Sequence, residues 1–328
     1  MKNLLLRKGQ KLIRNLNVIE EVNFYMKRVG LVGLGQMGMR MAFNLIKAGY
    51  EVVGYDIDKN AIKTLADHGG KPANSLKEVA EFSDVVILMV LTYPQVKSCI
   101  IEPDTLGDYM KPGSTLIITS TIAPQEIREV SEVVSSKGIN VLDSPVTGGT
   151  KGAEDGTLVM IVSGKDEVYK ECEDILKTIG ANAVQVGNEI GLGQVIKASV
   201  QLLVSVHLVA MAEALVLGTK AGADPEVLYD IIKKSAGNSW MLETKLPRIL
   251  NGDFSNSGAL DIQIKDLDIV QKIAREVNMP LFTSSVSKDV FLWGNALGYG
   301  RDDASSVIKV FEDIVGVKVR NHQVKEVK

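Results

Sequence analysis

The chain has 328 residues, of which 45% are hydrophobic and 23% charged, and its formal net charge is −3. This length allows a large core and favours two domains. The weak net charge, without a basic block, argues against nucleic acid as a partner. Two cysteines and three scattered histidines provide neither a disulfide framework nor the ligand spacing of a metal site. We therefore expect no metal and a reducing, cytoplasmic location.

Residues 1–25 differ from the rest of the chain. Five basic side chains precede the first carboxylate, Glu20. The apolar run Leu4–Leu6 is too short for the core of a signal peptide, and the scarcity of serine argues against a transit peptide. We treat residues 1–25 as an N-terminal extension without an assigned role.

Residues 28–38 have the pattern of a short apolar strand, a glycine-rich turn and a helix. In the motif Gly33-x-Gly35-x-x-Gly38, the glycines permit a tight turn, close approach of a pyrophosphate, and close packing of helix on strand. The N-terminus of the following helix would direct its positive dipole end at the phosphates. The predicted cofactor-binding turn consists of Gly33, Leu34, Gly35, Gln36, Met37 and Gly38. Ordinary turns contain the same glycine motif, so the surrounding sequence must show whether the turn binds a dinucleotide.

The next predicted strand, residues 51–56, ends on Asp56. This acid lies 18 residues beyond Gly38, where it can accept hydrogen bonds from the hydroxyls of the adenosine ribose. The same carboxylate would repel a 2′-phosphate, which favours NAD over NADP. A plain turn acid at a strand end is the alternative. We reject a calcium loop starting at Asp56, because Ala61 and Asp67 replace the glycine and glutamate that such a loop requires.

Further apolar runs alternate with helical patterns and predict an α/β fold with a doubly wound, Rossmann-type sheet. These runs cover residues 84–90, 115–118, 139–143 and 158–162. Tyr93 and Lys97 have the spacing of the catalytic pair of short-chain dehydrogenases. Because Pro94 follows the tyrosine and the glycine spacing is not that of this class, coincidence is the better interpretation.

The pattern changes from Gly191 onward. Residues 194–220 form a long, mostly apolar helical stretch, which is interrupted by Lys197, Gln201, His207 and Glu213. We therefore favour a helix buried between domains or subunits, and expect no membrane partner. Further helical patterns cover residues 225–235, 241–250, 262–277 and 283–297. The predicted organisation is a Rossmann domain over 26–190, an all-α domain over 191–320 and a tail over 321–328.

Three groups of residues are candidates for chemistry. Residues 143–152 are rich in turn formers, and the N–H groups of Thr147, Gly148 and Gly149 could hold a carboxylate; a plain crossover loop is the alternative. Lys197 has apolar neighbours, and desolvation would suit it to general acid/base work. A lysine extending to solvent at a helix end is the alternative. Gln201, one turn later, shares its face. The pair Lys265-Asp266, taken alone, predicts an ion pair on the surface.

Four segments in the same order resemble the 3-hydroxyisobutyrate dehydrogenase (β-hydroxyacid dehydrogenase) family, which is related to 6-phosphogluconate dehydrogenase. They are residues 32–38, 143–149, 193–197 and 265–267, and together they span almost the whole chain from residue 28. The resemblance implies an all-α second domain built around the long interdomain helix, and a homodimer or homotetramer.

The resemblance also implies roles for individual residues. Lys197 would be the catalytic acid/base, and the Thr147-Gly148-Gly149 turn would bind the substrate carboxylate. The cofactor would have Thr121 and Lys265 at its nicotinamide end, while its cleft would be lined by Val90, Leu91 and Gln95. The chain departs from the family at Gln201, usually Asn, at Thr147, more often Ser, and at Leu91, usually Pro. Gln201 keeps an amide but adds a methylene, so its substrate contact could be displaced.

The predicted function is reversible hydride transfer between NAD and a small 3-hydroxy acid, of the 3-hydroxyisobutyrate, tartronate semialdehyde or succinic semialdehyde type. One alternative is an oxidative decarboxylase like 6-phosphogluconate dehydrogenase, although the chain lacks the larger C-terminal helical region of that enzyme. A second is a non-catalytic NAD sensor, which would need only the cofactor site. A third is an imine reductase, a kind of family member that typically loses the lysine retained here as Lys197.

Overall fold

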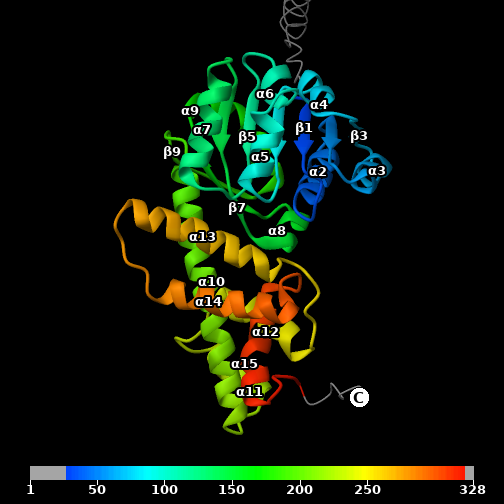
Figure 1. Ribbon diagram of the computed structural model, residues 1–328. Helices are drawn as coiled ribbons and strands as arrows, with labels where there is room; N and C mark the ends of the chain where they lie inside the picture. The colour runs from blue at the N-terminus through cyan, green and yellow to red at the C-terminus, as the bar shows by residue number, and fades with distance from the viewer. Residues whose placement is uncertain (1–26, 322–328) are drawn as a thin grey trace, which may run out of the picture.

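The computed structural model describes residues 27–321, so the predicted extension 1–25 and the predicted tail beyond Asn321 lie outside the described residues. Figure 1 shows an α/β body and a helical body stacked end to end, with one long helix, α10 (Leu192–Lys220), running through both. The arrangement is a Rossmann-type domain followed by an all-helical domain, as the sequence predicts.

The sheet of the α/β body is mostly parallel. Its strand order is β3-β2-β1-β4-β5-β6-β8-β7, and β9 pairs with β8. The strands are β1 (Val29–Val32), β2 (Val52–Tyr55), β3 (Lys71–Pro72), β4 (Val85–Leu88), β5 (Thr115–Ile118), β6 (Asn140–Asp143), β7 (Val146–Thr147), β8 (Val159–Ser163) and β9 (Asn182–Gly187). This order places the carboxyl ends of β1 and β4 side by side, where a doubly wound sheet binds its ligand.

Helices cover both faces of the sheet because its central strands are apolar on both sides. In β4, Val85 and Ile87 belong to one hydrophobic core, whereas Val86 and Leu88 belong to the opposite one. The first core contains residues of α2 (Gly38–Lys47), α3 (Lys59–Asp67), α8 (Gly149–Asp155) and α9 (Asp166–Ile179). The second contains residues of α4 (Leu76–Phe82), α5 (Tyr93–Ile100), α6 (Leu106–Tyr109) and α7 (Pro124–Ser135). The central strands therefore pack against helices on both faces of the sheet.

The sheet departs from a wholly parallel arrangement beyond β6. There β8 pairs with β6 in the antiparallel direction through Asp143 and Ser163, and β7 pairs with β8 in the same sense. The short strand β7 runs in the same direction as β6, and the chain reverses through α8 before it enters β8. The strands β3, β7 and β9 were not predicted from the sequence.

Helix α10 joins the two bodies. Its length and apolar composition would suffice to cross a membrane. It nevertheless packs against β6, β8, β9 and α7 of the α/β body and against the surrounding helices of the second body. Those helices and helical turns are α11 (Pro225–Ile232), α12 (Trp240–Leu250), α13 (Leu260–Glu276), α14 (Thr283–Gly294), η1 (Asn295–Tyr299), η2 (Ala304–Val307) and α15 (Ile308–Val315).

A buried ion cluster joins η2 to α12. The fully buried carboxylate of Asp303 accepts hydrogen bonds from Lys245 Nζ at 2.8 Å and Arg248 Nη1 at 3.3 Å. Its other oxygen caps η2 through the N–H of Ser305 at 3.0 Å. Burial alone would raise the pKa of Asp303, but the Lys245 cation and the hydrogen bonds hold it below its ordinary value.

Candidate active site

Most of the predicted site residues lie at one edge of the sheet. The glycine-rich turn follows β1, Asp56 follows β2, Val90 and Leu91 follow β4, and Thr121 follows β5. In a parallel sheet these carboxyl ends face the same side. Figure 1 shows that this edge is the one directed at the helical body. Loops from separate parts of the sequence therefore surround one interdomain region.

The three glycines of the glycine-rich turn differ in the space that a Cβ would have at each position. Gly33 has φ +91°, and a Cβ there would lie 2.1 Å from the Met89 carbonyl oxygen. At Gly38, the first residue of α2, a Cβ would lie 1.9 Å from the Gly33 carbonyl oxygen. At Gly35, by contrast, a Cβ would meet nothing within 4 Å. The open space at Gly35 fits the close approach of a pyrophosphate, whereas the other two glycines serve the fold itself.

Asp56 is tied to this turn. One of its carboxylate oxygens accepts a hydrogen bond from the N–H of Leu34 at 2.6 Å, and the other accepts from the N–H of Asp58 at 2.8 Å. The acid is half-buried. The geometry fits both a ribose-binding acid and a support for the glycine-rich backbone. Gln36 and Met37 lie at the start of α2, where Met37 occupies the N-cap position without a side-chain cap.

The loop after β4 is held by Gln95. Its side-chain carbonyl accepts hydrogen bonds from the N–H groups of Leu91 at 2.9 Å and Thr92 at 3.0 Å. The N–H of Val90 donates to Ser120 Oγ at 3.0 Å. Gln95 therefore shapes the loop through its own carbonyl, and Val90 is joined to the neighbouring loop after β5.

The Thr147-Gly148-Gly149 turn connects β7 to α8. Thr147 pairs with Val159 in the sheet, and both glycines adopt positive φ, +126° at Gly148 and +65° at Gly149. Such angles favour glycine, because other residues carry a Cβ that crowds the backbone. A Cβ at Gly149 would meet nothing within 4 Å, so open space adjoins the turn.

Lys197 is buried on α10. Lys197 is only 6% exposed, and its Nζ donates a hydrogen bond to Gln201 Oε1 at 2.8 Å. Burial lowers the pKa of Lys197 to about 8; Asp266 opposes this shift and Lys265 adds to it. The prediction that Lys197 and Gln201 share a face is confirmed. The alternative of a lysine extending to solvent is excluded by the burial.

Gln201 links Lys197 to a second helix. Its Nε2 donates to the Asp266 carboxylate on α13, so both ends of the amide are engaged inside the protein. Asp266, 3% exposed, also forms an ion pair with Lys265 at 2.9 Å, and Lys265 Nζ donates to the Thr121 carbonyl at 2.9 Å. The prediction of a surface pair is wrong for Asp266, because this carboxylate lies on the buried side of α13. Sequence reasoning placed Asp266 on the surface and did not assign it to the site.

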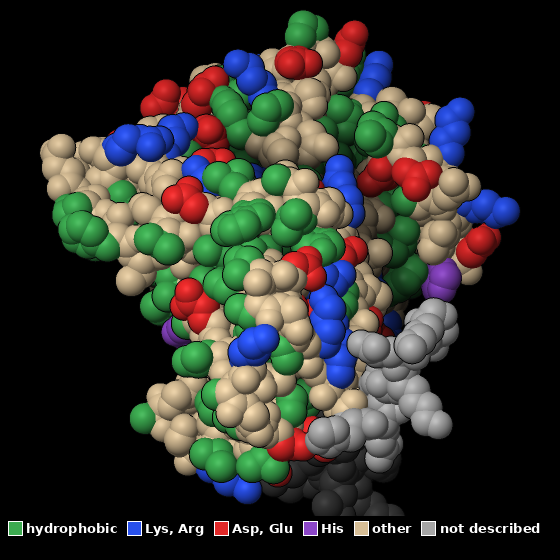
Figure 2. All heavy atoms as spheres, turned by 60° about the horizontal axis from the view of Figure 1, so that its bottom comes forward, with side chains coloured by type: hydrophobic (Ala, Val, Ile, Leu, Met, Phe, Trp, Pro, Cys, Tyr) green, Lys and Arg blue, Asp and Glu red, His purple; other side chains and the backbone are tan. Residues whose placement is uncertain are grey.

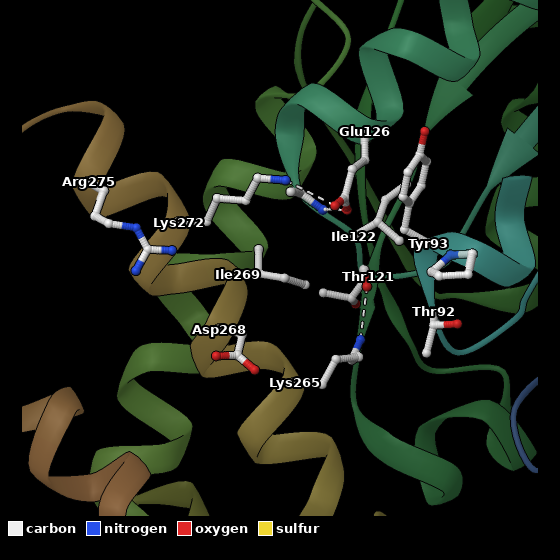
Figure 3. A pocket seen from close by; sticks show the side chains of 12 residues that line it. Thr92, Tyr93, Thr121, Ile122, Glu126, Lys265, Asp268, Ile269, Lys272 and Arg275 are labelled. Carbon is white, nitrogen blue, oxygen red and sulfur yellow. Dashed lines mark hydrogen bonds and ion pairs between the residues drawn. The ribbon is translucent and has the colours of Figure 1, made fainter.

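A cleft of about 410 Å³ opens between α13 and the α/β body. It is lined by Thr92, Thr121, Glu126, Lys265 and Lys272, among others. Figure 3 shows Lys265 reaching Thr121, and Lys272 reaching Glu126 at 3.0 Å, from α13 across the gap. Two predicted cofactor residues thus lie in the wall of an interdomain cleft.

Comparisons with known proteins cover both bodies of the fold. A family model described as the NAD-binding domain of 6-phosphogluconate dehydrogenase matches residues 28–187. A second, described as NAD-binding of NADP-dependent 3-hydroxyisobutyrate dehydrogenase, matches residues 191–311. The two models together account for both bodies of the fold.

Three individual proteins show how far the similarity extends. The chain is 36% identical to L-threonate dehydrogenase of Cupriavidus necator, over 88% of this chain and 97% of that protein. It is 35% identical to 2-(hydroxymethyl)glutarate dehydrogenase of Eubacterium barkeri, over 90% and 98%. The crystal structure of 3-hydroxyisobutyrate dehydrogenase from Salmonella typhimurium matches with a TM-score of 0.81 and 33% identity, over 86% of this chain and 99% of that one.

Proposed function

The chain belongs to the 3-hydroxyisobutyrate dehydrogenase-like family of β-hydroxyacid dehydrogenases, and from this premise we propose that it reversibly oxidises a small 3-hydroxy acid with Lys197 as general acid/base. Members of this family are NAD(P)-dependent oxidoreductases that act on hydroxyl groups. The observation that carries the proposal is the buried amine of Lys197, whose pKa is lowered to about 8. At this value the amine can both take and return a proton near neutral pH.

Lys197 supplies the proton chemistry. During oxidation its neutral amine takes the hydroxyl proton, and during reduction the ammonium returns a proton to the carbonyl oxygen. The nicotinamide, when bound, accepts or gives the hydride at its C4 position. Gln201 holds the amine in place from one side, and Asp266 holds Gln201 from α13. We assign Gln201 to the substrate pocket as well, because displacing its bond to Lys197 would free its carbonyl for a ligand hydroxyl.

The remaining roles concern recognition. The Thr147-Gly148-Gly149 turn would bind the substrate carboxylate through backbone N–H groups, which its positive φ angles support. Thr121 and Lys265 would lie by the nicotinamide, and their mutual hydrogen bond across the interdomain cleft supports this placement. The open space at Gly35 supports a bound pyrophosphate. NAD is preferred to NADP because the Asp56 carboxylate would repel a 2′-phosphate.

Substrate choice can be tested with a panel of acids. The named relatives act, by their names, on L-threonate, 2-(hydroxymethyl)glutarate and 3-hydroxyisobutyrate, and each compound carries a hydroxyl β to a carboxylate. We expect oxidation of at least one of these acids, or reduction of tartronate semialdehyde, measured by NADH absorbance. We also expect kcat/KM to be higher with NAD than with NADP. Inactivity on every compound would contradict the proposed function, and a strong preference for NADP would contradict the role of Asp56.

We also propose that the protein is a homodimer or homotetramer and works in the cytoplasm. Thirteen of the sixteen large apolar side chains exposed in the described residues belong to the helical body, and Figure 2 shows apolar side chains gathered over it. On α10, Leu203, Ala210 and Leu217 are exposed at intervals of seven residues, and Leu203 and Leu217 are 54% and 72% exposed. Such a stripe is typical of a helix that packs against another helix.

This assembly has a direct test. Sedimentation velocity at micromolar concentration should show a dimer or tetramer for the wild-type protein. The double variant Leu203→Glu/Leu217→Glu should shift toward the monomer, because burying two carboxylates in an apolar interface is costly. Val184→Glu, at an exposed position on β9, is the matched control and should leave the assembly unchanged. A monomeric wild-type protein would contradict the proposal.

A further inference from the structure

The start of α10 is capped by a residue from another element. Its N-cap, Gly191, has no side chain that could satisfy the first N–H groups of this 29-residue helix. The carboxylate of Asp143, at the end of β6, takes that place. Its Oδ2 accepts from the N–H groups of Gly191 at 3.0 Å and Gln194 at 3.4 Å, and from Ser163 Oγ at 3.0 Å. The Ser163 hydroxyl accepts in turn from the N–H of Gly193 at 3.1 Å.

This cap leaves no room for movement. Asp143 is fully buried, and a Cβ at Gly193 would lie 3.0 Å from its Oδ2 and 2.8 Å from the Ile161 carbonyl oxygen. The helix therefore lies directly against the strand ends. A carboxylate at a helix N-terminus is also favoured by the helix dipole.

Gln194 extends the same connection to the cofactor side. Its Nε2 donates to Asp143 Oδ1 at 2.7 Å and to the Ser120 carbonyl at 3.0 Å, and its Oε1 accepts from the N–H of Ile122 at 3.1 Å. Ser120 and Ile122 are the two neighbours of Thr121 in the chain. Asp143 itself stands four residues before Thr147. One buried carboxylate thus connects the loop after β5, the predicted carboxylate-binding turn and the first turn of α10.

We infer that Asp143 is a positioning residue that fixes the buried location of Lys197. Lys197 follows Gln194 by three residues, so it lies one turn beyond the capped end of the helix. Any displacement of that turn moves the lysine relative to both the sheet and α13. The inference rests on the proposed function only in making Lys197 the proton-transfer group, since the positioning itself is a property of the fold.

The variant Asp143→Asn tests this inference. All the partners of the carboxylate donate hydrogen bonds, so an amide NH2 would oppose at least one of them, and the first turn of α10 would shift. The readout is competitive acetylation of Lys197 with acetic anhydride against pH, without NAD, followed by mass spectrometry. The wild-type midpoint should lie at about 8. In the variant it should rise by at least about one unit toward the ~10.4 of an exposed lysine.

The charged groups that face Lys197 are Asp266 and Lys265 on α13, and the substitution leaves both in place. A higher midpoint therefore reports a displaced Lys197, which has become less buried or has moved closer to Asp266. Activity should follow: at pH 8 a rise of one unit from a pKa of about 8 lowers the neutral fraction of the lysine from about a half to about a tenth, so kcat for oxidation should fall about fivefold.

Asp303→Asn is the matched control, since Asp303 is an equally buried carboxylate that accepts hydrogen bonds from Lys245, Arg248 and Ser305, none of which forms a hydrogen bond with α10. It should lower thermal stability and leave the midpoint at the wild-type value. If Asp143→Asn does not fold, the variant Ser163→Ala tests the inference instead. It should raise the acetylation midpoint of Lys197 by less than Asp143→Asn would. A wild-type midpoint in the folded variant, or an equal rise in Asp303→Asn, would overturn the inference. Because the acetylation needs no substrate, its midpoint can be measured even if the proposed function is wrong.

Discussion

Replacing Lys197 with methionine is expected to reduce kcat for oxidation by about 10²–10⁴-fold, the usual contribution of a general acid/base group. Methionine keeps an unbranched apolar stem in the buried position and removes only the amine, so the fold should persist. NAD binding, measured by titration calorimetry, should stay near the wild-type value because the cofactor-binding turn lies elsewhere. Activity above about a tenth of the wild-type level would contradict the acid/base role of Lys197.

The pH dependence supplies a second readout for the same residue. Oxidation needs the neutral amine, so kcat/KM should rise with pH through the Lys197 pKa of about 8. Reduction needs the ammonium, so its rate should fall as pH rises through the same value. The control is Lys220→Met at the exposed C-terminal end of the same helix, which should keep both profiles. If neither rate changes with pH near 8, another group must transfer the proton.

The sequence predicted the parts of the fold that carry a strong burial signal. The strands β4 and β5 are continuous apolar runs because both of their faces are covered, and they were predicted. The edge strands were missed for the opposite reason. Lys71 and Pro72 of β3 are exposed, and β9 is half-exposed along its length, so neither shows such a run. Helix α15 was also not predicted, although Ile308, Phe311 and Val315 have helical spacing.

The candidate site shows a similar division between local and distant contacts. Lys197 and Gln201 were predicted to share a face because they lie one turn apart, and their hydrogen bond confirms it. Their link to Asp266 joins residues 65 positions apart, and no spacing rule indicates such a contact. The same holds for Asp143 and Gln194, which are 51 positions apart. Folding brings these polar groups together, and only the structure shows that they share hydrogen bonds.

The glycines of the glycine-rich turn meet two different physical requirements, one of the fold and one of the ligand. Gly33 and Gly38 are needed by the ligand-free fold, since a Cβ at either position would collide with a backbone carbonyl. Gly35 lies in open space and outside the left-handed region, so the ligand-free fold does not require a glycine there. The remaining reason for a glycine at position 35 is the ligand itself.

Gly35→Ala is therefore expected to weaken NAD binding about a hundredfold, or ~2.7 kcal/mol, while changing the free energy of unfolding by less than ~0.5 kcal/mol. The added methyl group occupies the space through which a pyrophosphate would approach the backbone. Gly33→Ala is the comparison variant. Its positive φ and the clash with the Met89 carbonyl should cost more than ~2 kcal/mol of stability, with loss of NAD binding as well.

Calorimetric titration with NAD and urea unfolding of both variants measure these two effects separately. A Gly35→Ala protein that binds NAD like the wild type would show that the pyrophosphate does not lie at this turn. A Gly35→Ala protein as unstable as Gly33→Ala would show that the open space at Gly35 is filled in solution. Loss of binding at unchanged stability would assign Gly35 to the cofactor and Gly33 to the fold, because only the first position depends on the ligand.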